Sequence, residues 1–354
     1  MHDRSRLACL IAAGGTAGHV LPALAVAESL RRNGVHVTFA GSPERVEARL
    51  VPESGFEFDS FRVSGLPRRP GPTQLRALMR SASAPAACLR ILANRRPDVV
   101  FGGGGFVAGP MVLAAWLRRI PAALSEADAH LGLANRLALP FARRVFLAYP
   151  IQTGPRVRVV GRPIPERSRP VGRAEARREL GLPEEGQVLL VSGALAGARA
   201  LNELAVGAWG CSGPTVLHLS GERDFELLRG RVDRPGYRLL PSVERFGSAL
   251  SAADLVLARA GGSVWEIAAA GRPAILVPYP YATGDHQTSN ARHFASAGGA
   301  LLVPETEVER VPGLVRELLA DGPRLAAMSA AMLRAARPDA ADEIARELID
   351  LATA

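Results

Sequence analysis

The chain has 354 residues, 48% of them hydrophobic, which predicts a globular protein of two domains rather than a disordered chain. All 43 basic residues are Arg, so the sequence excludes chemistry that needs a lysine amine, such as a Schiff base or a P-loop. Residues 1–163 carry 22 Arg and 10 acidic residues, a net charge of +12, whereas residues 164–354 carry a net charge of −3. An anionic partner is therefore expected for the first half, and nucleic acid, an anionic membrane surface and a phosphorylated substrate all remain open.

Short aliphatic runs alternate with helical patterns along the whole chain, which indicates βα units and parallel sheets. In the first half we expect strands at residues 7–12, 36–40, 57–61, 98–101, 121–124 and 144–147. In the second half we expect them at 156–160, 187–191, 215–219, 237–240, 254–257, 274–277 and 300–303. The predicted fold class is α/β, with two doubly wound, Rossmann-like domains facing a cleft.

Proline-rich sequence marks the domain boundary, because five prolines interrupt regular structure between Pro150 and Pro170. We expect an N-terminal domain at residues 1–160 and a C-terminal domain at 161–335. The last two helices are expected at 323–334 and 340–352. No further strand follows them, so the segment 336–354 is expected to pack back toward the N-terminal domain.

The first candidate site is the turn Gly14-Gly-Thr-Ala-Gly18, which is followed by His19 and lies between the first strand and a helix expected to open with Pro22. A glycine-rich turn at a helix N-terminus exposes backbone N–H groups that hold phosphate. The spacing is not that of a dinucleotide-binding loop, and a plain tight turn with a surface histidine is the alternative. His19 is nevertheless placed at the carboxyl end of the sheet, where ligands bind in open α/β folds.

A second glycine loop, Gly102 to Gly105, follows the strand expected at 98–101. Four glycines in a row permit very close backbone approach and add little to stability by themselves. Two such loops in one basic domain indicate a diphosphate ligand, and a flexible loop is the alternative.

Three further motifs carry polar or glycine-rich turns in the second half. Gly193 to Arg199 follows a strand, and Arg259 to Gly262 leads into a helix with Glu266 near its start, where a carboxylate stabilises the helix end or accepts ribose hydroxyls. Gly284 to Asn290 supplies capping and amide groups that can bind sugar hydroxyls. No cluster of His, Asp and Glu with metal-ligand spacing appears, so neither a metal nor a cofactor is expected.

Two features concern the cellular setting. No apolar stretch reaches the roughly 18 residues of a spanning helix, and the three cysteines are too far apart for a disulfide framework or a metal pair. Residues 67–96 repeat apolar side chains at near-helical spacing among arginines. This segment is either an ordinary helix with its apolar side in the core or an interfacial element attracted to anionic lipid.

Taken together, these motifs resemble the MurG family, the peptidoglycan N-acetylglucosaminyltransferases that act on lipid-linked muramyl-pentapeptide. The resemblance covers nearly the whole chain and depends on the order and spacing of the motifs. They are Gly14–His19, Pro22–Ala25, Glu47–Pro52, Gly102–Pro110, Glu126, Gly132–Asn135, Gly161–Pro163, Gly197–Asn202, Ala260–Gly271 and Asp285–Ala291.

The resemblance implies a GT-B fold and metal-independent, inverting transfer of GlcNAc from UDP-GlcNAc. The acceptor is the 4-hydroxyl of the N-acetylmuramyl-pentapeptide on undecaprenyl diphosphate, and the protein is implied to be peripheral on the cytoplasmic face of the cell membrane. It also implies roles in cell-wall biogenesis, cell shape and cell division. The N-terminal domain would take the lipid acceptor and the C-terminal domain the nucleotide sugar.

Residue roles carried over by position make His19 the candidate base, with Asp128 as a rival, and assign the acceptor diphosphate to Gly14, Gly15, Gly103 and Gly104. The donor-binding set comprises Thr16, Ala17, Gly18, Asp128, Pro165, Leu195, Gly197, Ala198, Arg199, Glu266, His286 and Gln287. The chain departs from the usual family pattern at Leu195, where a hydroxyl is lost, at Asp128, where an amide often lies, and at Pro165, where an Arg is common.

Three other functions are open on the sequence alone. The chain is compatible with another GT-B glycolipid transferase that uses a UDP-sugar, and the N-terminal loops would separate the two. The departures at Leu195 and Pro165 also fit a catalytically lapsed protein that binds a UDP-sugar or a membrane. Nucleic-acid binding is the least supported, because the basic region lacks interleaved aromatic residues.

Overall fold

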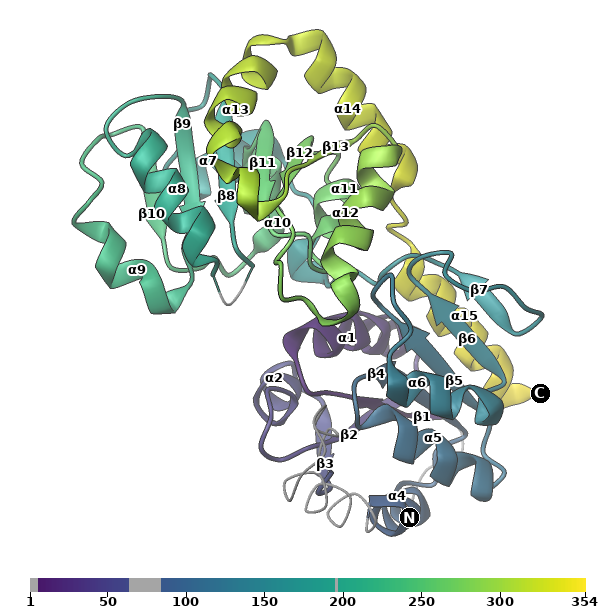
Figure 1. Ribbon diagram of the computed structural model, residues 1–354. Helices are drawn as coiled ribbons and strands as arrows, with labels where there is room; N and C mark the ends of the chain where they lie inside the picture. Colours follow the sequence, from purple (N-terminus) through teal and green to yellow (C-terminus); the bar gives the residue numbers. More distant parts are fainter. Residues whose placement is uncertain (1–5, 64–83, 195–196) are drawn as a thin grey trace. The chain divides into compact units, whose positions relative to one another are not determined.

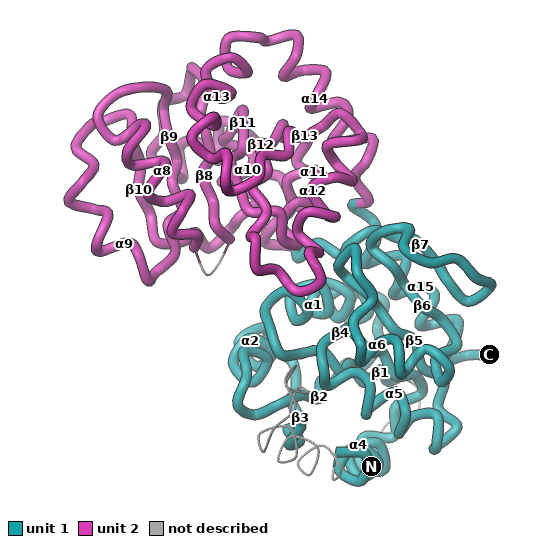
Figure 2. Tube along the Cα trace, in the orientation of Figure 1, with its two compact units in different colours: residues 1–165, 338–354 teal, residues 166–337 magenta. Residues whose placement is uncertain are grey.

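The computed structural model describes residues 6–63, 84–194 and 197–354, and the chain divides into two compact units (Figures 1 and 2). Unit 1 comprises Met1–Pro165 and Pro338–Ala354, and unit 2 comprises Glu166–Arg337. The chain therefore leaves unit 1, completes unit 2 and returns. The boundaries expected from the sequence were after residues 160 and 335.

A parallel sheet forms the centre of unit 1. Its strands are β1 (Ala8–Ala13), β2 (His36–Gly41), β3 (Glu57–Ser60), β4 (Val99–Gly104), β5 (Ala122–Glu126), β6 (Arg144–Leu147) and β7 (Val157–Val159). Within the described part of unit 1 these seven strands have the order β3-β2-β1-β4-β5-β6-β7. Strand β7, which the sequence pattern groups with the strands of the second half of the chain, pairs with β6, Val145 opposite Val157, and so belongs to the first sheet. This agrees with the expected N-terminal domain, which already included residues 156–160.

Helices cover both faces of this sheet. They are α1 (Ala17–Arg32), α2 (Glu47–Glu53), α4 (Ala84–Arg95), α5 (Ala108–Leu117), α6 (Leu133–Ala138) and α15 (Ala340–Thr353), with a short 3-10 turn η1 (Leu139–Phe141). Side chains of β1 alternate between the faces. Cys9 and Ile11 share a core cluster with α1 and α15, whereas Leu10 and Ala12 share one with α4 and α5. This arrangement confirms the doubly wound fold for unit 1.

Unit 2 repeats the plan with β8 (Val188–Ser192), β9 (Thr215–Leu219), β10 (Tyr237–Leu240), β11 (Leu255–Ala258), β12 (Ala274–Leu276) and β13 (Ala300–Leu302). Among the described residues the strand order is β10-β9-β8-β11-β12-β13, all parallel. The helices are α7 (Arg173–Glu179), α8 (Arg199–Trp209), α9 (Glu222–Arg229), α10 (Phe246–Ala252), α11 (Val264–Ala269), α12 (His286–Ser296), α13 (Val311–Ala320) and α14 (Gly322–Ala335). Short 3-10 turns are η2 (Glu166–Ser168), η3 (Thr283–Asp285) and η4 (Glu305–Arg310).

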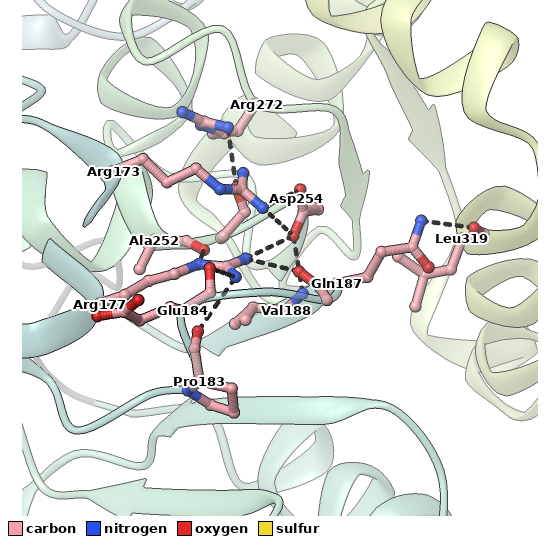
Figure 3. A network of polar contacts seen from close by, with 12 residues as sticks. Arg173, Arg177, Pro183, Glu184, Gln187, Val188, Ala252, Asp254, Arg272 and Leu319 are labelled. Atoms are coloured by element: carbon pink, nitrogen blue, oxygen red, sulfur yellow. Dashed lines mark hydrogen bonds and ion pairs between the residues drawn. The ribbon is translucent and has the colours of Figure 1, made fainter.

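One aspartate in each unit links the two central strands by hydrogen bonds at their amino ends, β1 to β4 in unit 1 and β8 to β11 in unit 2. Asp98 accepts a hydrogen bond from the Ala8 amide at 2.8 Å, and its own amide donates to the Ala8 carbonyl. Asp254 forms the same pair of bonds with Val188 in unit 2. The buried Arg177 adds to this second pair by bonding Asp254 at 3.1 Å (Figure 3). These contacts lie at the end of the sheet opposite the ligand-binding edge expected for open α/β folds.

Helix α1 begins at Ala17 and not at Pro22, the start expected from the sequence. Thr16 is its N-cap and has extended backbone angles, so the helix forms directly after the glycine turn. Pro22 consequently lies inside the helix, where its missing N–H leaves the carbonyl four residues earlier, that of Gly18, without a helical donor.

Helix α15 belongs to unit 1, where the C-terminal segment was expected to pack. Asp342 bonds the Arg32 guanidinium of α1 at 2.8 Å, and Glu347 bonds Arg144 of β6 at 3.0 Å. Helix α14, in contrast, remains with unit 2 and packs on α11. Across the described segments, every helix is too short or too polar to cross a bilayer.

Candidate functional site

The loop between β1 and α1 is held in place by its own amides. The Gly14 N–H donates to the Gly104 carbonyl at 3.3 Å, and the Gly15 N–H donates to Glu47 Oε2 at 3.0 Å. Gly15 has a φ of 90°, and a Cβ there would lie 2.9 Å from the Phe106 ring. The amides of Gly14 and Gly15 are thus engaged within the protein, so these residues shape the loop rather than donate to an anion.

Glu47 is fully buried and bonds two turns at once. Its Oε2 accepts from Gly15, and its Oε1 accepts from the Ser42 amide at 3.1 Å. The side chain packs so closely on Gly14 and Gly41 that a Cβ at either position would collide with it. No role for Glu47 could be predicted from the sequence, although the residue belongs to the motif Glu47–Pro52.

The first helical turn of α1 presents the available N–H groups. In the part of the chain that the structure describes, the amides of Thr16, Ala17 and Gly18 have no hydrogen-bond acceptor. Thr16 and Gly18 are exposed, and Ala17 is half-buried. Unpaired amides at the positive end of a helix favour an anion.

His19 lies between the two glycine loops. Its imidazole Nδ1 is 3.2 Å from Thr16 Oγ1, and a Cβ at Gly104 would lie 2.7 Å from its Cδ2. Gly105 is as confined, because a Cβ there would lie 2.0 Å from the Gly14 carbonyl oxygen. Gly103 approaches Ala13 and Ala23 in the same way. The second loop therefore packs closely against the His19 ring and the first loop, which explains why this loop is a run of glycines.

The last residue of β5, Glu126, places a buried carboxylate beside the loop that follows the strand. Glu126 accepts hydrogen bonds from the Gly132 amide at 2.9 Å, from Asn135 Nδ2 at 3.0 Å and from the Asp128 amide at 3.4 Å. Burial is the main reason that the pKa of Glu126 is raised above its ordinary value, and the Asp128 charge adds to the rise. These bonds fix the loop that carries Asp128, which is half-buried.

Arg162, which follows β7, joins this loop to α1. It is 7% exposed, and its guanidinium donates to the carbonyl oxygens of Gly18 and of Ala127, the latter at 2.9 Å. Asp128 Oδ1 lies 3.7 Å from Arg162 Nη1. Asp128 is therefore paired with an arginine, which sequence reasoning did not anticipate. Pro165 is buried at the end of unit 1 and offers no side-chain donor.

Unit 2 contains a cavity of about 900 Å³ at the carboxyl ends of its central strands. Four of the expected donor-binding residues line it, namely Gly197, Ala198, Arg199 and Gln287. Gly197 has a φ of 70°, and a Cβ there would lie 2.2 Å from the Ser220 carbonyl oxygen, so this turn requires glycine. Leu195 lies outside the described residues.

One wall of the cavity is built around Arg259. This residue is 8% exposed, donates to the carbonyl oxygens of Val277 and Pro278, and forms an ion pair with Glu305. The Tyr279 ring lies 5.5 Å from its guanidinium carbon, and the Tyr279 amide donates to Gln287 Oε1 at 2.9 Å. This hydrogen bond leaves the Gln287 amide nitrogen as the donor that can face a ligand.

The arginines of the cavity differ in their pairing. Arg223 bonds Asp224, and Arg259 bonds Glu305. Arg199, the first residue of α8, forms no ion pair within the described segments. A guanidinium that forms no close ion pair beside a glycine turn suits a phosphate, although its charge also acts on Asp224, whose pKa is lowered mainly by Arg223 and in part by Arg199.

Beneath the cavity a buried network fixes Asn202, a cavity-lining residue. Asn202 Nδ2 donates to the Ser220 carbonyl and to Asp224, both at 2.9 Å, so its Oδ1 accepts from His218 Nε2 at 3.0 Å. His218 is therefore a neutral Nε2–H tautomer, and its Nδ1 accepts from the Tyr237 hydroxyl at 2.8 Å. Burial lowers the pKa of His218 to about 4. Sequence reasoning missed this network because its members come from four separate elements, α8, β9, α9 and β10.

Two expected donor contacts that belong to unit 2, Glu266 and His286, lie outside the cavity lining. Glu266 is half-buried in the first turn of α11. His286 begins α12, and its Nδ1 donates to the Thr283 carbonyl at 2.8 Å. The two helices follow β11 and β12, so both residues lie toward the same edge of the sheet as the cavity.

Comparison with known proteins identifies the family. Residues 9–147 match the glycosyltransferase family 28 N-terminal domain, and residues 188–344 match its C-terminal domain. A relative from Halorhodospira halophila is 42% identical over 95% of this chain and 96% of its own length, and one from Halothermothrix orenii is 36% identical over 96% and 97%. Both are named UDP-N-acetylglucosamine–N-acetylmuramyl-(pentapeptide) pyrophosphoryl-undecaprenol N-acetylglucosamine transferase. The chain belongs to the MurG family.

A solved structure agrees with this assignment. MurG from Acinetobacter baumannii is 30% identical, covers 98% of this chain with 99% of its own, and superposes with a TM-score of 0.80. The MurG resemblance expected from the sequence motifs is confirmed, as is the GT-B fold class. The chain is a glycosyltransferase of family 28.

Proposed function

We infer that this protein transfers GlcNAc from UDP-GlcNAc to the muramyl-pentapeptide carried by undecaprenyl diphosphate, a step of peptidoglycan synthesis. The observation that carries the inference is similarity along nearly the whole chain to relatives named for that transfer. Another glycolipid transferase is less favoured, because the similarity extends through unit 1, where an acceptor would be distinguished.

We assign the acceptor side of the reaction to unit 1 and the donor side to unit 2. The open amides of Ala17 and Gly18 suit a diphosphate, and the positive charge of residues 1–163 favours an anionic lipid. The cavity of unit 2 supplies a glycine turn, the Arg199 guanidinium and the Gln287 amide for the nucleotide sugar. We keep Glu266 as the ligand of the ribose hydroxyls.

His19 is our candidate for the base that removes the proton from the acceptor hydroxyl. When its Nδ1–H donates to Thr16 Oγ1, the lone pair that accepts a proton lies on Nε2. The ring lies in the first turn of α1, against the second glycine loop, so Nε2 is the nitrogen that serves as the base. An in-line attack then expels UDP with inversion at the anomeric carbon, and the α8 turn balances the charge of the leaving diphosphate.

A transfer assay tests the proposed function. Purified protein is incubated with radiolabelled UDP-GlcNAc and a short-chain polyprenyl-diphosphate muramyl-pentapeptide, and we expect one labelled disaccharide lipid for each UDP released. UDP release without labelled lipid, or no turnover at all, would contradict the assignment. The same lipid without its muramyl sugar is the control acceptor.

We also propose that unit 1 binds an anionic membrane surface on the cytoplasmic face, where a polyprenyl acceptor is accessible. Trp116, Leu117, Leu133 and Leu137 are each more than half exposed. Next to them lies a cavity of about 600 Å³ lined by Trp116, Phe141 and the arginines 119, 143, 144 and 156. Exposed apolar side chains among arginines favour anionic lipid.

The segment 67–96, expected to be either a core helix or an interfacial element, is only partly described. Residues 64–83, which include Leu75, Leu78, Met79 and Ala82, lie outside the described residues. Residues 84–95 form α4, which buries Ala84, Cys88, Ile91 and Leu92 in the core of unit 1. For this part of the segment, the core alternative holds.

A further inference from the structure

Arg162 is a buried arginine whose bonds join two loops of the candidate acceptor site. Its Nη2 donates to the Gly18 carbonyl in the first turn of α1, and its Nη1 donates to the Ala127 carbonyl after β5 at 2.9 Å. The planar guanidinium directs both bonds from one rigid group. Gly18 and Ala127 are 109 positions apart in the sequence, and this single side chain links them.

The Gly18 carbonyl needs this bond because of the local sequence. In an α-helix the carbonyl of residue 18 accepts from the N–H of residue 22, and residue 22 is Pro, which has none. Without Arg162 the first turn of α1 loses the hydrogen bond to the carbonyl of Gly18, the residue next to His19. Pro22 and Arg162 are therefore complementary, since one removes a donor and the other replaces it.

Arg162 also faces Asp128. The Asp128 carboxylate lies 3.7 Å from Nη1, and the guanidinium is almost completely shielded from water. Two of its partners are neutral carbonyls, so Asp128 is the partner that compensates its charge. A carboxylate in this position is bound to a permanent cation and is poorly suited to accept a proton from a substrate.

We propose that Arg162 is a positioning residue for the transfer reaction, one that holds the His19 turn of α1 against the β5 loop with Asp128 as its counter-ion. The proposal rests on the proposed function and goes beyond it, because it removes Asp128 from the candidate bases. Arg162 acts through the geometry of its neighbours and contacts neither substrate.

The first test replaces Arg162 with Met, which keeps an unbranched apolar stem and removes the guanidinium donors. The matched control is Arg158→Met on β7, since Arg158 also bonds carbonyl oxygens, those of Pro155 and Val157, but away from the site. We expect kcat of Arg162→Met to fall by about 10- to 100-fold, the size of effect of a small misplacement, with little change in KM for UDP-GlcNAc. The control should keep both constants.

Hydrogen exchange supplies a readout that is independent of activity. We expect faster exchange in Arg162→Met for a peptide covering residues 14–24 and for one covering 126–133, with unchanged exchange over β8 in unit 2. Should Arg162→Met fail to fold, Arg162→Lys is the second variant, because an ammonium keeps the charge but lacks the fork that reaches both carbonyls.

Rescue separates positioning from a general loss of structure. Pro22→Ala restores the N–H that Gly18 lacks, so Arg162→Met/Pro22→Ala should recover part of the lost kcat and of the exchange protection at residues 14–24. Adding Asp128→Asn to Arg162→Met removes an uncompensated charge and should also be less harmful than the two single losses combined.

Three results would overturn the proposal. They are unchanged kcat and unchanged exchange in Arg162→Met, no recovery with Pro22→Ala, and a kcat loss in Asp128→Asn as large as that in His19→Ala. If the wild-type protein transfers no GlcNAc, the proposed function fails, while the exchange measurements still decide whether Arg162 fastens the two loops.

Discussion

The carboxylate of Glu47 occupies the space beside Gly14 that any larger residue would need. A Cβ at position 14 would lie 2.2 Å from Glu47 Oε1, and the two oxygens of Glu47 already accept the amides of Gly15 and Ser42. Packing against the buried Glu47 side chain is therefore sufficient to require glycine at position 14. This contact determines where the first turn of α1, and with it His19, can lie.

Replacing Glu47 with Gln should destabilise unit 1. The amide nitrogen would face one of the two backbone N–H groups, so a buried hydrogen bond to a charged group is lost, at a cost of about 1.5–3 kcal/mol. Urea denaturation followed by the fluorescence of Trp116, which lies in unit 1, would measure it. Glu53→Gln at the exposed end of α2 is the control. Equal stabilities of the two variants would show that Glu47 is not a structural link.

His19→Ala should lower turnover by about 10²–10⁴-fold, the usual contribution of a general base, while UDP binding stays nearly intact. Asp128→Asn should cost less, because Asp128 is paired with Arg162. Single-turnover transfer with both variants decides the ranking. The opposite order, with a mild loss in His19→Ala and a severe one in Asp128→Asn, would make Asp128 the base.

Glu266→Ala should weaken UDP binding by about 1.5–3 kcal/mol if its carboxylate accepts the ribose hydroxyls. Isothermal titration with UDP measures this, and Glu317→Ala on the exposed side of α13 is the control. Glu266 is half-buried at the start of α11, so an unchanged affinity would leave it the role of stabilising that helix end.

Acid should destabilise unit 2 through His218. Its pKa is lowered to about 4 in the folded state, below the ordinary 6.5, so the unfolded state binds the proton more tightly. Stability is therefore lost as the pH falls from about 6.5 to about 4, by up to about 3 kcal/mol. Denaturation of wild type and His218→Gln, monitored by Trp209 and Trp265 in unit 2, should give a shallower pH dependence for the variant. Parallel curves would remove His218 as the cause.

Membrane binding should depend on both charge and apolar surface. Co-sedimentation with vesicles should rise with the fraction of anionic lipid and fall with added salt, since each arginine near the surface contributes about 1 kcal/mol. Trp116→Ser should weaken binding because Trp116 is 53% exposed. The substitution Tyr281→Ser, at an exposed aromatic residue of unit 2, is the control. Equal binding to neutral vesicles would contradict the electrostatic part.

The strand pattern could be predicted from the sequence because buried parallel strands are short aliphatic runs between turns, and each expected strand is present. The start of α1 could not be predicted, because Pro22 signals a first turn and only a tertiary contact from Arg162 allows it deeper in the helix. The roles of Glu47, Arg162 and the His218 network also depend on tertiary contacts, so they could not be predicted from the sequence. Their roles depend on which loops the fold brings together, and single-sequence spacing carries no information about that.

The return of α15 to unit 1 has a consequence for synthesis on the ribosome. Its residues Ala341, Ile344, Ala345, Leu348 and Leu351 complete the core cluster that contains β1 and α1, and they are translated after the whole of unit 2. Unit 2 is continuous and is finished earlier, so it can fold while unit 1 still lacks one side of its core. The chain order thus allows unit 2 to fold before unit 1, the reverse of the usual order in which the N-terminal domain folds first. Unit 1 therefore lacks part of its core until α15 has left the exit tunnel, so its maturation depends on translation of the segment that follows unit 2.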